Sequence, residues 1–385
     1  MKKLSLFVFV DAFGYEIAKD VEFLPDLLPH KKRLRSVFGF SSACVPSILS
    51  GRMPVEHRHW NFFYYSPRTS PFKGYRCLRF LPHFITKRSR FRYYLSKWMK
   101  KRLNFSGYFQ IYHIPFRYLH LFDTCEKRDM FKPGGLNVGT NIADYLVEKN
   151  VPYHLADWAT PEARRIEELR DVIRKGEVAF AFMYTADLDS MLHFNSSRSD
   201  VVRNKIDWYR KTMREVYEDA KKNYDEIDLT VFSDHGMAEI KQTYDVPGDI
   251  EKLGLKFGRD YVAMYDSTVA RFWFLTEGSR EKITVALEKI KCGRILPDEE
   301  LEKLGCLFPD RQFGELMFLL DAGALIVPSY MGLKPLFGMH GYHPDDADSY
   351  ACFMSSREWP VEPEYITDIY TLMKQSADEH LASKT

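Results

Sequence analysis

Aspartate and histidine side chains recur in this sequence directly after short apolar runs. The residues of this kind that follow such runs, together with one histidine late in the chain, are Asp11, Asp189, His193, Asp234, His235 and His340. Zinc and manganese accept carboxylate oxygens and imidazole nitrogens as ligands, and two such ions a few ångströms apart clamp a phosphoryl group. Burying this many carboxylates without cations would be costly. The pattern predicts a site for two divalent ions, with Zn²⁺ favoured and Mn²⁺ as the alternative.

The apolar runs themselves are typical of buried parallel strands. Residues 4–10, 177–184 and 228–232 form short apolar runs, and helices are expected at 161–175 and 199–222 between them. Strands that alternate with helices predict an α/β fold with a doubly wound, mostly parallel sheet and helices on both faces. In such sheets ligands bind beyond the carboxyl ends of the strands, where the acidic and imidazole groups are expected.

The first residues also imitate a targeting segment. Lys2 and Lys3 precede an apolar run of about seven residues that stops at Asp11, with no small-residue cleavage site after it. A buried strand is therefore favoured over a signal peptide. No run reaches the roughly 20 apolar residues of a membrane span, and the 6 cysteines include no CxxC pair, which argues against a disulfide framework. We expect a cytoplasmic protein.

The positive charge is concentrated in one stretch. The 385 residues carry a net charge of only +2, which excludes a uniformly basic nucleic-acid binder, and no nucleic-acid-binding motif is present. Between His57 and Phe122, however, 14 lysines and arginines occur without one acidic residue. We expect one domain over 1–385 with two insertions, a basic aromatic insertion at 57–130 and a small α+β cap at 255–335.

Three interpretations of the basic aromatic insertion remain open. Residues 84–102 can be wound as a helix with a partial apolar stripe. Such a helix can lie on an anionic membrane surface, which would make the protein peripheral to the membrane. It can also act as a lid over an anionic or lipid-linked substrate, or pack its stripe against the domain.

Five motifs run along nearly the whole chain in a fixed order. They are Asp11, Ser41 with S-I-L-S-G at 47–51 and Pro54, Asp189 with His193, S-D-H-G-M at 233–237, and H-G-Y at 340–342. In this order they resemble the alkaline phosphatase superfamily, and within it the type I phosphodiesterase/nucleotide pyrophosphatase branch. The resemblance implies an alkaline phosphatase-like fold and a metal-dependent hydrolase of phosphate esters.

The resemblance also implies individual roles. Asp189, His193 and His340 match the ligands of one metal ion. Asp11, Asp234 and His235 match those of the second, whose shell the nucleophile hydroxyl completes. Ser41 is the expected nucleophile, which would form a covalent phospho-seryl intermediate, and Ser42 is the runner-up. Metal coordination would lower the pKa of the hydroxyl and make it reactive.

The sequence departs from the family near the nucleophile. Cys44 stands where the family often has an asparagine that holds a phosphoryl oxygen. Asn61, His57 or a basic side chain of the insertion are the candidates to bind the substrate instead. Cys44 also begins a C-V-P-S segment similar to the sulfatase motif, so a sulfatase-like hydrolase stays open. So do transfer of a phospho-group on lipid- or glycan-linked substrates and a catalytically silent anion-binding protein. The sequence predicts no oligomeric state.

Overall fold

A central six-stranded sheet organises the computed structural model, which describes residues 2–382. In spatial order its strands are β2 (His30–Leu34), β16 (Ala351–Ser355), β7 (Glu226–Phe232), β1 (Lys3–Val10), β6 (Phe180–Thr185) and β5 (Tyr153–Leu155). The neighbours from β7 to β5 are parallel, whereas β16 is antiparallel to both of its neighbours. The predicted mostly parallel α/β sheet is therefore confirmed.

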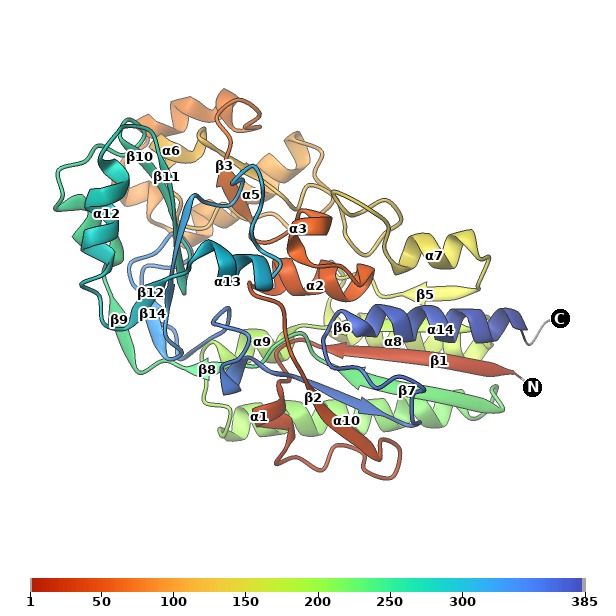
Figure 1. The fold of residues 1–385 in the computed structure, drawn as a ribbon. Coiled ribbons are helices and arrows are strands. Elements are labelled where there is room, and N and C mark those ends of the chain that lie inside the picture. The colour runs from red at the N-terminus through yellow and green to blue at the C-terminus, as the bar shows by residue number, and fades with distance from the viewer. Residues whose placement is uncertain (1, 383–385) are drawn as a thin grey trace.

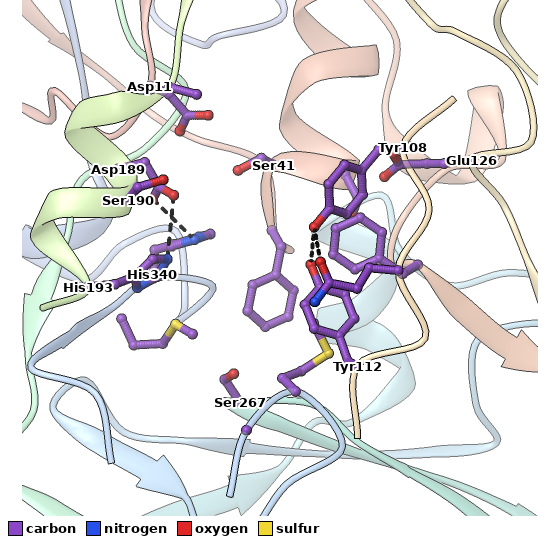
Figure 2. A pocket seen from close by; sticks show the side chains of 18 of the residues that line it. Asp11, Ser41, Tyr108, Tyr112, Glu126, Asp189, Ser190, His193, Ser267 and His340 are labelled. Atoms are coloured by element: carbon purple, nitrogen blue, oxygen red, sulfur yellow. Dashed lines mark hydrogen bonds and ion pairs between the residues drawn. The ribbon is translucent and has the colours of Figure 1, made fainter. Parts of the chain in front are cut away.

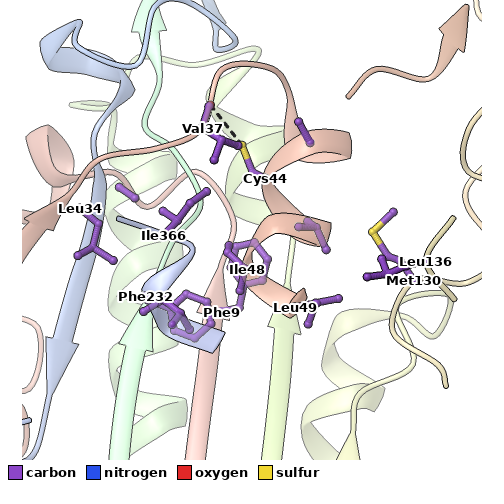
Figure 3. Packing of buried hydrophobic residues seen from close by; sticks show 14 of the residues in the cluster. Phe9, Leu34, Val37, Cys44, Ile48, Leu49, Met130, Leu136, Phe232 and Ile366 are labelled. Atoms are coloured by element: carbon purple, nitrogen blue, oxygen red, sulfur yellow. Dashed lines mark hydrogen bonds between the residues drawn. The ribbon is translucent and has the colours of Figure 1, made fainter. Parts of the chain in front are cut away.

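Both faces of this sheet are buried, as the continuous apolar runs predict. Along β1, Phe7 and Phe9 belong to one hydrophobic cluster, and Leu6 and Val8 belong to another on the opposite face. The second face is covered by α8 (Glu162–Lys175) and α10 (Asp200–Ala220). The first is covered by α2 (Ser41–Ser50), α7 (Ile142–Glu148) and α14 (Asp368–Ala382), as Figures 1 and 3 show. This double covering explains why the strands show no alternation of polar and apolar residues.

Local signals set the ends of several helices. The side chain of Ser199 accepts a hydrogen bond from the backbone N–H of Val202 and caps α10. The helix α2 ends at Gly51, whose φ of 68° lies in the left-handed region that glycine tolerates. A Cβ atom at Gly51 would also lie 2.8 Å from the ring of Tyr370, which belongs to α14. The end of α2 is therefore fitted closely against its neighbouring helix.

A second, four-stranded antiparallel sheet lies beyond the carboxyl ends of the central strands (Figure 1). Its order is β10 (Tyr261–Tyr265), β11 (Val269–Phe274), β13 (Leu316–Leu320) and β12 (Gly293–Ile295), and α12 (Ser279–Leu287) packs on it. The fully buried Arg271 of β11 is paired with Asp266 at 2.7 Å. Its guanidinium also donates to the carbonyl of Phe63 at 2.8 Å, which joins this sheet to the basic aromatic segment.

The predicted single helix over 84–102 is wrong. The segment contains η1 (Lys73–Phe80), α4 (His83–Thr86) and α5 (Ser89–Arg102). The helix is interrupted because Arg88 is extended and the buried side chain of Arg92 donates to the carbonyl of Thr86 at 2.5 Å. Of the predicted apolar stripe, Phe91, Leu95 and Met99 pack against a hydrophobic cluster, whereas Phe84 and Trp98 are exposed. Arg92 and Ser96 are buried on α5 as well.

The remaining elements are short and connect these units. They are α1 (Tyr15–Ala18), α3 (Pro54–His57), β3 (Phe63–Tyr65), α6 (Phe116–Leu119), β4 (Phe122–Thr124), α9 (Asp187–Leu192), β8 (Ala238–Glu239), β9 (Gln242–Tyr244), α11 (Val246–Glu251), α13 (Asp298–Lys303), β14 (Ala324–Ile326), β15 (Gly338–Met339) and η2 (Ala347–Ser349). Among residues 2–382, no helix combines the length and apolar character needed to cross a membrane.

Candidate active site

The carboxyl ends of the central strands bring most of the predicted site residues to one edge of the sheet. Asp11 directly follows β1, Asp234 and His235 lie just after β7, and α9 after β6 carries Asp189. A cavity of about 560 Å³ opens at this edge. Figure 2 shows Asp11, Asp189, His193 and His340 on one side of it, with Ser41 beside them. Positions far apart in the sequence therefore meet at one cavity, as the parallel sheet predicts.

The first candidate metal cluster consists of Asp189, His193 and His340. One ligand atom from each residue lies within 4.8 Å of the others. Asp189 is 3.4 Å from Nε2 of His193 and 3.6 Å from Nε2 of His340. Nδ1 of His193 lies 2.9 Å from the carbonyl oxygen of Gly338. Because a carbonyl oxygen accepts, Nδ1 would carry the proton, and Nε2 would then be free to bind a metal ion. Burial opposes the ionisation of Asp189, but the two imidazoles hold its pKa well below the usual value.

The second candidate cluster combines Asp11, Asp189 and His235, so Asp189 is common to both. Asp234, which the resemblance assigns to this ion, is fully buried and lies 3.1 Å from Nε2 of His235. Its other oxygen accepts hydrogen bonds from the backbone N–H groups of His235 and Ala12. Asp234 is thus beside the second cluster, and its Oδ2 is directed at the same imidazole.

Negative charge accumulates at the second cluster. Burial, together with the carboxylates of Asp234 and Asp189, raises the pKa of Asp11 well above its usual value. Burial would lower the pKa of His235, but the carboxylates of Asp234 and Asp11 outweigh it and raise that pKa to about 10. The buried carboxylates repel one another, and positive charge relieves this repulsion.

The donor atoms at both clusters fit divalent cations. Four buried atoms of the predicted ligands have no hydrogen-bond partner, and they are Oδ1 of Asp11, Oδ1 of Asp189, Oδ2 of Asp234 and Nδ1 of His340. Buried polar atoms are normally paired, so such a concentration of unpaired oxygen and nitrogen atoms fits the coordination of divalent cations. Carboxylate and imidazole donors suit Zn²⁺ or Mn²⁺.

The two candidate serines have different surroundings. Ser41 is the first residue of α2, and its Oγ lies 3.1 Å from Nε2 of His235 at the cavity wall. The adjacent Ser42 is buried and donates its hydroxyl hydrogen to the carbonyl of Trp60 at 3.3 Å. Cys44 is fully buried in the hydrophobic cluster between α2 and the sheet, as Figure 3 shows. Of these three side chains, only that of Ser41 contacts the metal-ligand cluster.

The candidate substrate-binding residues Asn61 and His57 do not line the cavity. His57 is buried with Nε2 at 2.9 Å from Oγ of Ser47, and its Nδ1 accepts from the backbone N–H of His59. Asn61 is buried beside Asp266, and its Oδ1 accepts from the backbone N–H of Phe62. The structure thus does not bring either side chain to the predicted metal ligands.

The cavity contains residues that the sequence patterns do not single out. The hydroxyl of Tyr184, near the end of β6, donates to Oδ2 of Asp11 at 2.6 Å. The position of Tyr184 next to the carboxyl end of a parallel strand is the sequence feature that could have identified it as a site residue. Tyr108, Tyr112 and Glu126 line the wall opposite the metal ligands (Figure 2). Glu126 could have been identified because it lies shortly after the stretch at 57–122 that lacks acidic residues.

Comparisons with known proteins agree with this arrangement. A family model described as type I phosphodiesterase/nucleotide pyrophosphatase matches residues 30–343. Comparison with curated proteins gave no match.

Solved structures show the same fold. Human ectonucleotide pyrophosphatase/phosphodiesterase 5 superposes with a TM-score of 0.69 at 15% sequence identity, over 97% of this chain and 95% of that one. The murine protein gives 0.68 at 15% identity over 97% and 95% of the chains. An inactive form of the murine protein in complex with AMP gives 0.67 at 14% identity over 98% and 95%. Since the family model spans most of the sequence, the chain belongs to the type I phosphodiesterase/nucleotide pyrophosphatase family of the alkaline phosphatase superfamily.

Proposed function

We propose that the protein is a metal-dependent hydrolase of phosphodiesters or pyrophosphates that uses Ser41 as its nucleophile. The observation that carries this proposal is the contact between Ser41 Oγ and a buried cluster of aspartates and histidines. The aspartates and histidines of this cluster come from four separate segments of the chain, and Ser41 comes from a fifth. Stability alone gives no reason to gather unpaired carboxylates beside a serine hydroxyl.

The side chains then have distinct tasks. Asp189, His193 and His340 would hold one divalent ion, and the residues that would hold the second are Asp11, Asp234 and His235. When bound, the ions would lower the pKa of the serine hydroxyl and neutralise charge on the phosphoryl oxygens. Ser41 loses its hydroxyl proton, its Oγ attacks phosphorus, and the bond from phosphorus to the leaving oxygen breaks, so that this oxygen takes up a proton from solvent. Water then attacks phosphorus, its oxygen stays on the phosphate, and Ser41 Oγ leaves and regains a proton.

Two features of the chain would orient this reaction. Ser41 is the first residue of the ten-residue helix α2, so the positive end of the helix dipole lies at Ser41 and favours a phosphate group there. Tyr184 holds one oxygen of Asp11 through its 2.6 Å hydrogen bond, which leaves the other oxygen for an ion. Cys44 is enclosed in the hydrophobic core, so a sulfatase-like reaction receives less support than attack by Ser41.

Turnover of a 4-nitrophenyl phosphodiester tests the proposal. We expect cleavage of the diester in preference to the 4-nitrophenyl monoester and sulfate ester. We also expect loss of activity with a chelator and recovery with Zn²⁺ or Mn²⁺, since the clusters need cations to bind phosphate. Metal analysis of the purified protein measures the stoichiometry, with two ions expected. Chelator-resistant turnover, or cleavage of the sulfate ester alone, would overturn the proposal.

We also propose that the outer face of residues 76–102 binds anionic membrane surfaces. Exposed aromatic side chains on it are Phe80, Phe84, Tyr94 and Trp98, with 55–75% of each accessible. Exposed cations are interspersed with them, namely Arg76, Arg79, Lys87, Arg88, Arg90, Lys97, Lys101 and Arg102. Aromatic rings that enter the headgroup region together with cations that attract anionic lipids are the usual components of an interfacial surface.

Vesicle binding tests the proposal that residues 76–102 bind anionic membranes. The triple substitution of Lys97, Lys101 and Arg102 by glutamine should weaken binding to vesicles containing phosphatidylserine roughly 100-fold, because each surface cation contributes about 1 kcal/mol. The matched control replaces three exposed lysines elsewhere, Lys282, Lys289 and Lys291, and should bind as the wild type does. Equal binding by all three proteins, or binding to pure phosphatidylcholine at the same strength, would contradict the proposal.

A further inference from the structure

The cavity wall opposite the metal ligands is polar. It is formed by Tyr108, Gln110, Tyr112 and Glu126, which together are called the polar wall below. The hydroxyl of Tyr108 lies 2.8 Å from that of Tyr112 and donates to Oε1 of Gln110 at 3.2 Å. In Figure 2 the two tyrosine hydroxyls project into the space in front of His193 and His340, and the carboxyl group of Glu126 is directed toward Ser41.

Glu126 is the residue of this wall that the protein itself leaves unsatisfied. Its side chain is buried, and its Oε1 has no hydrogen-bond partner. A buried carboxyl oxygen without a partner costs about 1–3 kcal/mol. Glu126 contributes no contact to the metal clusters, so their chemistry does not account for this cost. A ligand in the cavity would supply the missing hydrogen bond.

Helix α5 holds the loop that carries Tyr108, Gln110 and Tyr112 of the polar wall. Arg92 on the buried face of α5 donates to the carbonyl oxygens of Tyr112 and Ile114 at 2.7 and 2.8 Å. Oγ of Ser96, one turn further along α5, accepts from the backbone N–H of Ile111 at 3.0 Å. These bonds keep Tyr112 at a φ of 40°, an unfavourable conformation for a bulky residue. Strain of this kind is found mainly where a side chain must point in a particular direction for function.

The polar wall carries little charge at neutral pH. Burial raises the pKa of Tyr108 to about 12 and also raises the pKa of Tyr112 well above its usual value, so both hydroxyls remain protonated. Burial also raises the pKa of Glu126 to about 8, although the charge of Lys100 opposes this. The facing groups thus offer both hydrogen-bond donors and acceptors without repelling a phosphate ester.

Aromatic faces flank the polar groups. The ring of Phe62 lies 5.4 Å from that of Tyr108 and 5.8 Å from that of Tyr112. The ring of Trp158 lies 6.1 Å from that of Tyr108, and Trp158 also lines the cavity. Flat apolar surfaces next to paired donors and acceptors match a molecule with C–H faces and many hydroxyl groups. A simple alkyl chain would leave Oε1 of Glu126 without a hydrogen bond.

We propose that the polar wall binds the hydroxyl groups of a sugar or polyol that is esterified to the phosphate attacked by Ser41. This inference rests on the proposed function and adds the class of substrate. Tyr108, Tyr112 and Glu126 would discriminate between substrates by hydrogen bonds, and the aromatic rings would pack against the C–H face. The metal-ligand side of the cavity would hold the phosphoryl group at the same time.

Two matched diesters test the inference in the metal-loaded protein. Both carry 4-nitrophenol as the leaving group, and the second alcohol is either O6 of methyl glucoside or cyclohexylmethanol. We expect the wild type to favour the glucoside ester in kcat/KM by about tenfold for each hydrogen bond formed. The preference should fall to less than threefold in Glu126→Leu and decrease in Tyr112→Phe. Glu126→Gln, which still donates and accepts, should retain it, and the exposed Tyr365→Phe serves as the control.

A binding measurement separates failure of this inference from failure of the proposed function. Calorimetry with Ser41→Ala compares the affinity of methyl glucoside 6-phosphate with that of cyclohexylmethyl phosphate, and this comparison requires no turnover. Tighter binding of the sugar phosphate that Glu126→Leu abolishes supports the polar wall even if no diester is cleaved. Equal affinities, or equal cleavage of both diesters by the wild type, would overturn the inference and leave the hydrolase proposal standing.

Discussion

Replacement of Ser41 by alanine should reduce diester turnover by roughly 10⁴- to 10⁶-fold, the range typical for loss of an attacking nucleophile. The reason is that Ser41 Oγ is the hydroxyl in contact with His235 at the ligand cluster, at 3.1 Å. The fold should be little affected, since Ser41 is partly exposed at the first turn of α2. Steady-state kinetics, with thermal unfolding as a check of folding, measure the effect.

Ser42→Ala is the matched control for this experiment. It removes the hydrogen bond to the carbonyl of Trp60, which should lower the free energy of unfolding by about 1 kcal/mol and change turnover only slightly. Acid quenching of the wild type should trap a phosphorylated serine, and peptide mapping should locate it at Ser41. Label at Ser42, with turnover retained in Ser41→Ala, would mean that the nucleophile is the adjacent residue.

Substitution of Asp189 by asparagine should have the second-largest effect. Its two oxygens approach His193 and His340, and it belongs to both candidate clusters. Asparagine preserves the shape but removes a negative charge from a residue that belongs to both candidate clusters. Because loss of residues that only support metal ligands already costs 10- to 100-fold, we expect a loss of roughly 10³-fold or more in turnover. Metal analysis should show fewer than two ions per chain.

Asp187→Asn provides the control from the same short helix. The carboxylate of Asp187 is exposed and paired with Lys205 at 2.9 Å, an interaction worth at most about 1 kcal/mol. Metal content and turnover should therefore remain close to those of the wild type. If Asp187→Asn lost metal and Asp189→Asn kept it, the assignment of ligands on α9 would have to be exchanged.

The parallel core of the fold could be predicted because its pattern is local. The strands β1, β6 and β7 are apolar on both faces, and α10 begins after Ser199, whose side chain caps it. The strand β2 was not predicted, because its sequence HKKRL is charged and its place at the sheet edge leaves alternate side chains exposed. Likewise, α5 was misjudged because Arg92 is buried through bonds to distant carbonyl groups.

In the candidate site, too, some residues could be predicted from the sequence and others could not. The predicted metal ligands meet at the sheet edge because each follows a strand or lies in a recognisable motif. Asn61 and His57 were candidates to bind the substrate in place of the asparagine that Cys44 replaces, yet their side chains bond within the protein and do not line the cavity. Short-range position along the chain does not determine the direction of a side chain beyond the next turn.

Residue order alone determined the parallel sheet, the candidate ligands of two ions and the family, because strand ends and motifs are properties of neighbouring residues. Only the tertiary structure decided which serine hydroxyl reaches the ligands and that Tyr108, Tyr112 and Glu126 face them across a cavity. Three members of the polar wall, Tyr108, Gln110 and Tyr112, lie on a loop that is hydrogen-bonded to α5, whereas Glu126 follows β4. Such contacts link side chains to backbone groups of distant segments, and no periodicity in the sequence encodes them.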